Sequence, residues 1–124
     1  MSKALNISLW IAQALLAVAF LFAGGMKLIL SSETLAKNPG PSVALVRFIG
    51  VAEVAGALGM ILPMVTRIRP RLTALAAVGL ATVMLLAIGF HVMRGELSHI
   101  PAPAVLGALA VFVAWGRRRA GEKT

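Results

Sequence analysis

Long apolar stretches dominate the chain, and short polar links separate them. Three stretches have the length of a helical membrane span, since a helix needs about 20 residues to cross a hydrocarbon core, and a fourth is short for a span but is interpreted as one. They cover residues 7–30, 43–64, 72–92 and 102–115. The pattern predicts an all-α membrane protein, built as one four-helix transmembrane bundle over residues 1–124.

The links between these runs are short, and the prolines lie in them or at their borders. Proline has no backbone N–H, so it is tolerated best at or between helix ends. The six prolines are Pro39, Pro41, Pro63, Pro70, Pro101 and Pro103. Short links favour antiparallel neighbours, so the expected topology is up-down-up-down.

A cleaved signal peptide is the alternative for the first run, but this run continues well past the apolar segment of such a peptide.

Composition points to the same environment. Hydrophobic residues make up 60% of the chain, charged residues make up 13%, and the mean hydropathy is +0.94. A soluble domain is about half apolar and about a quarter charged. The expected partner of this surface is therefore a lipid bilayer. The chain has no cysteine, which excludes disulfides, thiol redox chemistry and thiolate metal sites.

The formal net charge of +8 comes mostly from basic residues that lie between the apolar runs or beyond their ends, so nucleic-acid binding is not expected. One side of the predicted bundle holds Lys3, Arg67, Arg69, Arg71, Arg117, Arg118, Arg119 and Lys123. The other side holds Lys27, Lys37, Arg47 and Arg94. Basic residues accumulate on the cytoplasmic side, and Trp10 and Trp115 lie on the richer side as interfacial anchors. Both termini are therefore expected to be cytoplasmic.

Lys27 and Glu53 are the first ionisable residues of the apolar runs to consider, because such groups are costly in a membrane and are functional candidates. Lys27 lies in "LFAGGMKLIL", one turn from the end of the first run, and Glu53 lies in "RFIGVAEVAG". Glu53 follows the start of the second run by about 15 Å of helix. Because the two helices are antiparallel neighbours, Lys27 and Glu53 are expected to meet and neutralise each other. The alternatives are that this pair only holds the helices together, or that Glu53 is a neutral carboxylic acid.

Glycines surround both ionisable residues and should allow close helix approach. The expected helix-packing positions are Gly24, Gly25, Gly50, Gly56 and Gly59. Small residues also suggest where the chain would self-associate as a homo-oligomer, and those positions are Gly56, Ala57, Gly79 and Gly89.

A second polar group is expected at the same side of the bundle as Lys27. Arg47 opens the second run, His91 closes the third, and Arg94, Glu96 and His99 follow in the next link. If the second and third helices pack together, these side chains and Lys27 surround one pocket mouth. His91, Glu96 and His99 are residue types that bind metals, but their spacing does not place them on one helical face. No metal or haem site is therefore predicted.

The chain resembles the DoxX-like family of small membrane proteins. The resemblance rests on "FAGGMKL", "RFIGVAEVAGALGMILP" and "AIGFHVMRGE", and it extends from about Trp10 to Trp115. The family pattern falls on Gly24, Lys27, Arg47, Gly50, Glu53, Pro63 and His91, with the proline closing the second helix. The resemblance implies a four-helix protein of the bacterial inner membrane. Its relatives act beside redox enzymes, including a thiosulfate:quinone oxidoreductase and thiol-stress enzymes.

These observations favour an accessory subunit of a membrane redox system, which is not an enzyme on its own. It would have no covalent cofactor and would bind a quinone or a similar hydrophobic molecule. Lys27, Arg47 or His91 would donate a hydrogen bond to a carbonyl oxygen, Glu53 would move a proton, and a redox-enzyme partner would supply electrons. The alternatives are a small proton-coupled transporter, a purely structural assembly subunit, and an enzyme acting on a lipid with Glu53 as general acid or base.

Overall fold

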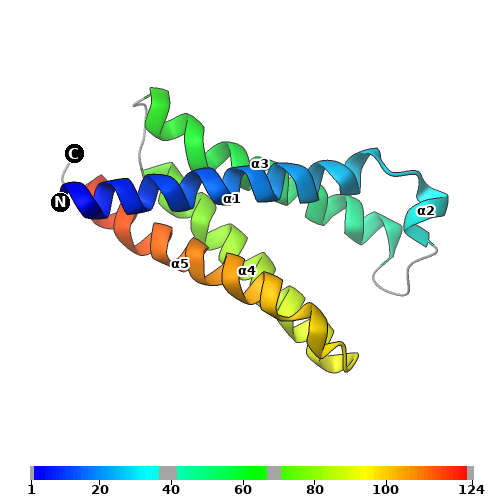
Figure 1. The fold of residues 1–124 in the computed structure, drawn as a ribbon. Coiled ribbons are helices and arrows are strands. Elements are labelled where there is room, and N and C mark those ends of the chain that lie inside the picture. The colour runs from blue at the N-terminus through cyan, green and yellow to red at the C-terminus, as the bar shows by residue number, and fades with distance from the viewer. Residues whose placement is uncertain (1, 37–41, 67–70, 123–124) are drawn as a thin grey trace.

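The computed structural model describes residues 2–36, 42–66 and 71–122, and these residues are helical with no strand. The long helices are α1 (Lys3–Ile29), α3 (Val43–Thr66), α4 (Arg71–Met93) and α5 (Pro101–Glu122). The short helix α2 (Ser32–Ala36) and the 3-10 turn η1 (Leu97–His99) lie in two of the links (Figure 1). All four long helices have the length and apolarity of membrane spans. The predicted all-α architecture with four spans is confirmed.

Some predicted link residues lie outside the described residues. They are Lys37, Pro39, Pro41, Arg67, Arg69, Pro70 and Lys123. Both chain ends lie at one end of the bundle, which we call the terminal end. The opposite end carries α2 and η1 and is called the α2–η1 end (Figure 1).

Pro63 does not close its helix, because α3 continues for almost one more turn to Thr66. A proline inside a helix leaves the carbonyl four residues earlier without its usual N–H donor. That carbonyl belongs to Gly59, and the Thr73 hydroxyl of α4 donates a hydrogen bond of 2.9 Å to it. A side chain from the neighbouring helix therefore satisfies the acceptor, and the helix passes through the proline.

The last helix is longer than its apolar run. The run ends at Trp115, whereas α5 begins at Pro101 and continues to Glu122. Proline is well suited to the first helical position, and arginine and alanine are good helix formers. The basic segment after Trp115 is therefore an extension of the helix and not a link, which changes the position of Arg117 described below.

The helices pack as two antiparallel pairs, α1 with α3 and α4 with α5. Contacts between α3 and α4, and between α1 and α5, join the pairs. The buried core between them includes Leu16 and Phe20 of α1, Met60 of α3, Leu80 of α4 and Val113 of α5. The α4–α5 pair diverges from the α1–α3 pair toward the α2–η1 end (Figure 1).

The outer surface is apolar along every long helix. Large side chains on it are mostly exposed, including Phe22 at 71%, Val51 at 56%, Leu86 at 69% and Val111 at 58%. Soluble monomers rarely present so much contiguous apolar surface to water. The chain is therefore an integral membrane protein, and the surrounding bilayer covers these side chains.

Candidate functional site

Lys27 of α1 and Glu53 of α3 form an ion pair between two membrane-spanning helices. The Lys27 Nζ donates to the Glu53 Oε1 at 2.5 Å. Glu53 is only 1% exposed, whereas a third of the Lys27 side chain remains accessible. The structure thus brings Lys27 and Glu53 together, and the lysine is the member that other molecules can reach.

Arg47 completes the end of the first helix beside this pair. Its Nη1 donates to the carbonyl oxygens of Lys27 and Leu28, both at 2.8 Å. The last carbonyls of a helix have no intrahelical donor, so a basic side chain from the next helix can satisfy them. Arg47 therefore fixes the backbone that carries Lys27.

The glycines next to the ion pair allow the two helices to touch through their backbones. A Cβ placed on Gly24 would lie 2.8 Å from the Gly50 carbonyl oxygen and 3.0 Å from the Glu53 Cβ. A Cβ on Gly50 would lie 2.9 Å from the Lys27 Cβ. Small residues permit such close approach between membrane helices. Gly24 and Gly50 are therefore the positions that bring Lys27 within reach of Glu53.

The other predicted packing glycines do not contribute to this contact. A Cβ on Gly25 would meet nothing within 4 Å. Gly56 and Gly59 face α4, where a Cβ would lie 2.6 Å from the Leu80 Cδ2 and the Ala76 Cβ respectively. These two glycines join the helix pairs and do not bring α1 close to Glu53.

The small residues predicted as a self-association surface include both packed and exposed positions. Gly56 already packs against Leu80, and Ala57 is buried at 1% exposure. Gly79 and Gly89 are exposed, with no atom within 4 Å of an added Cβ. Of these four residues, the two α4 glycines are therefore the exposed ones.

Replacing Gly24 with alanine is expected to lower the free energy of unfolding by about 2 kcal/mol, because the new methyl group overlaps backbone that cannot move independently. Gly25→Ala is the matched control, since it adds the same group one residue away into open space. It should be neutral or stabilising by about 0.5–1 kcal/mol through helix propensity. SDS titration followed by far-UV circular dichroism would measure both, and equal effects would contradict the helix contact described here.

His91 belongs to a different polar cluster, at the junction of α4 and η1. Gly95 has a φ of 71°, and the amide of Glu96 donates to the His91 carbonyl at 2.9 Å, which ends α4 with a Schellman motif. The Glu96 Oε1 then lies 3.3 Å from the His91 Nδ1 and accepts a hydrogen bond of 3.0 Å from the Arg94 Nε. The His99 ring stacks on His91 with a centroid separation of 5.2 Å.

Electrostatics in this cluster favour the ionised form of Glu96. Desolvation raises the pKa of its carboxyl group, but the hydrogen bond with His91 and the charge of Arg94 outweigh it and lower the pKa below the ordinary value of 4.5. Among the described residues, no three His, Cys, Asp or Glu side chains are placed to hold a metal ion. The cluster therefore ties the α4–α5 turn together as an ion-pair group.

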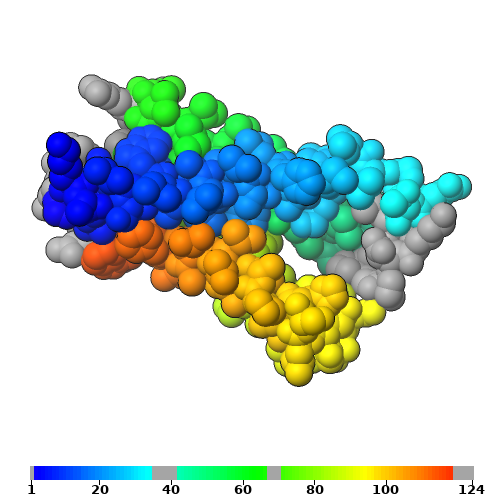
Figure 2. Space-filling model, in the orientation of Figure 1, coloured from blue at the N-terminus to red at the C-terminus, as the bar shows by residue number. Residues whose placement is uncertain are grey.

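The residues that were predicted to surround one pocket mouth lie on two different helix pairs. Lys27 and Arg47 lie on the α1–α3 pair, whereas His91 contacts residues of its own helical hairpin. The two pairs diverge at this end, which a sequence with short links does not reveal (Figure 2). The structure thus groups Lys27, Arg47 and Glu53, and it places His91 apart from them.

A third polar network is buried at the terminal end, and the apolar pattern did not indicate it. The Arg117 Nε donates to the Gln13 Oε1 at 2.5 Å, and the Arg117 Nη1 donates to the Asn6 Oδ1 at 2.9 Å. The Gln13 Nε2 in turn donates to the Met60 carbonyl at 2.5 Å. Arg117 is 2% exposed and lies over the Trp10 ring at 5.5 Å. This network joins α1, α3 and α5.

Comparison with known proteins supports the resemblance seen in the motifs. The chain matches the DoxX-like family over residues 11–113. It belongs to that family. No curated protein and no solved structure matches the chain. In this DoxX-like chain, the contact network between α1 and α3 consists of Gly24, Lys27, Arg47, Gly50 and Glu53.

Proposed function

We propose that this DoxX-like protein is an accessory subunit of a membrane redox system and that it binds a quinone or a similar hydrophobic carbonyl compound beside Lys27. The observation that carries the proposal is an ion pair within membrane-spanning helices whose lysine is one-third accessible. Ionisable groups at such positions are costly and usually serve transport, proton transfer or ligand binding.

The chemistry of the pair suits a carbonyl ligand. A lysine ammonium has three N–H donors, and the hydrogen bond to Glu53 occupies one of them. Another donor can bind a carbonyl oxygen at the surface of α1. Glu53 can exchange a proton with a bound ligand through Lys27. Neither side chain carries electrons, so a partner enzyme would supply them.

The two helix pairs leave room for an apolar ligand toward the α2–η1 end. Figure 2 shows the surface hollowed between α1 and the α4–α5 pair toward the α2–η1 end. The hollow faces the hydrocarbon region, so a ligand dissolved in the bilayer would enter it laterally. Aromatic and aliphatic side chains on the diverging helices would contact the ring and tail of such a ligand.

The proposed location is the bacterial inner membrane with both termini in the cytoplasm. The two chain ends lie at the same end of the bundle (Figure 1). Among the described residues, Lys3, Arg71, Arg117 and Arg118 lie at that end, as do Trp10 and Trp115. Basic links and interfacial tryptophans both favour this orientation.

A purely structural role is the second candidate, and the burial of Glu53 favours it. The Gly24–Gly50 contact closes the helix interface around the carboxylate, which is 1% exposed. In that case the pair would set helix register without binding anything, as buried ion pairs do in some proteins. A partner protein would then dock on the finished bundle.

Direct analysis of co-purified small molecules separates the two candidates. The protein is extracted from its host membrane in lipid nanodiscs, and bound quinone is quantified per chain by mass spectrometry. We expect about one equivalent in the parent protein, loss of it in Lys27→Gln, and retention in Lys3→Gln, which changes an exposed lysine at the terminal end. A parent protein without enrichment over the surrounding lipid, or equal quinone in both variants, would reject the ligand-binding role.

A further inference from the structure

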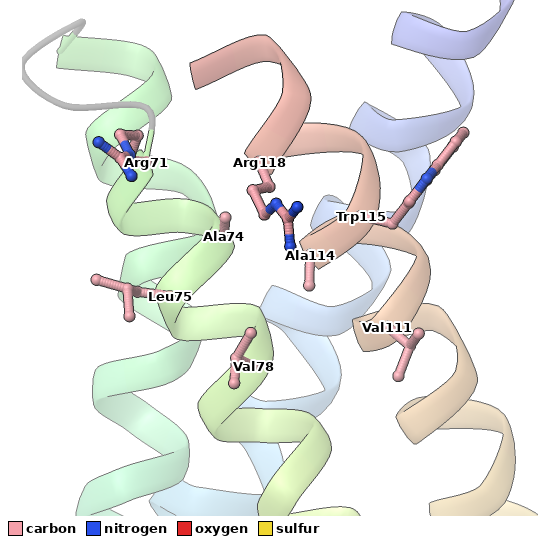
Figure 3. Close-up of a pocket in the computed structure, with 8 residues that line it drawn as sticks. All are labelled: Arg71, Ala74, Leu75, Val78, Val111, Ala114, Trp115 and Arg118. Carbon is pink, nitrogen blue, oxygen red and sulfur yellow. The ribbon is translucent and has the colours of Figure 1, made fainter. Parts of the chain in front are cut away.

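A groove between α4 and α5 opens at the terminal end, away from the Lys27–Glu53 pair. Its volume is about 740 Å³. Its lining residues are Arg71, Ala74, Leu75, Val78, Val111, Ala114, Trp115 and Arg118. Figure 3 shows Arg118 extending between the two helices at the same level as the first turn of α4, which carries Arg71, while Val78 and Val111 lie farther along. The groove therefore has a basic end and an apolar remainder.

A second groove of about 490 Å³ continues the first along the same helix pair. The two share Val78, Val111 and Ala114 as lining residues. Together they follow α4 from Arg71 to Ile88, which is about 26 Å of helix. One leaflet of the hydrocarbon core is about 15 Å thick, half of the whole core. The combined groove is thus long enough to hold an acyl chain that extends through its leaflet.

We propose that this α4–α5 groove is a binding site for an anionic phospholipid. The lipid phosphate lies between Arg71 and Arg118, and one acyl chain lies along Leu75, Val78 and Val111. Guanidinium groups match the geometry of phosphate oxygens with paired N–H donors. Basic pockets between membrane helices recognise lipid head groups in this way.

Several features of the groove place its basic end at head-group level. Arg71 is the first residue of α4, so its side chain lies where the helix leaves the hydrocarbon region. The N-terminus of a helix also carries a partial positive charge, which adds to the attraction for an anion. Trp115 lines the same end and is half exposed, as expected of an indole ring at a membrane interface. The apolar residues then follow in the direction of the acyl region.

The charge distribution also argues for a lipid and against a second copy of the chain in this groove. Copies inserted in the same orientation bring their terminal ends to the same level. Among the residues whose side chains are described, Lys3, Arg71, Arg117 and Arg118 belong to that end, whereas Glu33, Glu53 and Glu96 belong to the other half of the bundle. Two such ends repel each other, and an anionic lipid neutralises them.

Native mass spectrometry of the full chain in nanodiscs tests the proposal with defined lipids. The nanodiscs contain phosphatidylglycerol and phosphatidylcholine in equal amounts and with the same acyl chains, so the two lipids differ only in their head groups, of which the first is net anionic and the second is zwitterionic. We expect the released protein to retain phosphatidylglycerol at least about tenfold over phosphatidylcholine. The Arg71→Gln/Arg118→Gln double variant should lose this preference, and Lys3→Gln, an exposed basic residue outside the groove, should keep it.

A second pair of variants tests the acyl-chain part without changing any charge. Val78→Trp fills both grooves from an exposed position, whereas Leu86→Trp adds the same ring on α4 outside them. Val78→Trp should reduce phosphatidylglycerol retention at least about tenfold, and Leu86→Trp should leave it unchanged. Equal retention of the two lipids overturns the proposal. A dimer that persists without lipid and is lost in Val78→Trp also overturns it, because a second copy of the chain then occupies the groove. Displacement of the lipid by millimolar glycerol phosphate overturns it as well, because the site then binds a free phosphate compound and not a phospholipid.

Discussion

Replacing Lys27 with methionine should lower the free energy of unfolding by about 3 kcal/mol or more. The substitution leaves the Glu53 carboxylate at 1% exposure without its cationic partner. Breaking a buried ion pair on one side typically costs about 3–5 kcal/mol, because the remaining charge is desolvated and uncompensated. Methionine retains the length of the aliphatic stem, so lost packing contributes little. SDS titration followed by far-UV circular dichroism would measure the loss.

The double variant Lys27→Met/Glu53→Met separates the charge effect from packing. Replacing a whole buried pair by apolar side chains of similar volume is often neutral or stabilising. The double variant should therefore regain most of the stability that Lys27→Met loses. Losses that simply add would mean that the two side chains do not interact in the folded protein. A stable double variant also provides the test protein for ligand binding, since it removes the proposed donor without unfolding the bundle.

Much of the fold follows from the hydrophobic pattern because each span must satisfy its own backbone hydrogen bonds in the bilayer. Uninterrupted apolar runs therefore predict helices with little ambiguity, and short links predict antiparallel order. The Lys27–Glu53 contact is predictable for a related reason. Two opposite charges on adjacent helices, each beside a glycine, have few other ways to be neutralised. The close approach at Gly24 and Gly50 follows from the same two stretches of sequence.

Other features depend on how each helix is rotated about its own axis and on how the helix pairs are inclined to each other. The apolar runs do not encode either property. Lipid-facing and core-facing positions are equally hydrophobic here, so the sequence did not show that Gly56 and Gly59 face α4 and not α1. The divergence of the α4–α5 pair, which separates His91 from Lys27, was hidden for the same reason. Pro63 illustrates a different limit, because its helix continues only with the help of Thr73 from another helix.

Arg117 was expected in a link because it begins a run of three arginines after the last apolar segment. A helix that continues past Trp115 turns the Arg117 side chain toward the core. The signal that could have found it is the polar pair Asn6 and Gln13, seven residues apart on one face of the first helix. A buried glutamine side chain needs hydrogen-bond partners, and an arginine at the same end of the bundle can supply donors.

Replacing Arg117 with leucine should destabilise the bundle by about 3 kcal/mol. It leaves the Gln13 Oε1 and the Asn6 Oδ1 without the N–H donors that they have now, and each lost partner costs about 1–3 kcal/mol. Leucine fills part of the space, so the loss reports mainly on the polar contacts. Lys3→Leu removes the same charge from an exposed position at the same end of the bundle and should change stability by less than about 0.5 kcal/mol.

Adding Gln13→Leu to both backgrounds shows whether the two side chains act as one network. Gln13→Leu alone removes the acceptor for Arg117 and the donor for the Met60 carbonyl, so it should be strongly destabilising. In the Arg117→Leu background the Arg117 contact is already absent, and the same change should cost about 1–2 kcal/mol less. Equal costs in the two backgrounds would show that Arg117 is held by its cation–π contact with Trp10 and not by Gln13. The terminal end of the bundle would then be joined through the indole ring, and Trp10→Leu would become the more damaging substitution.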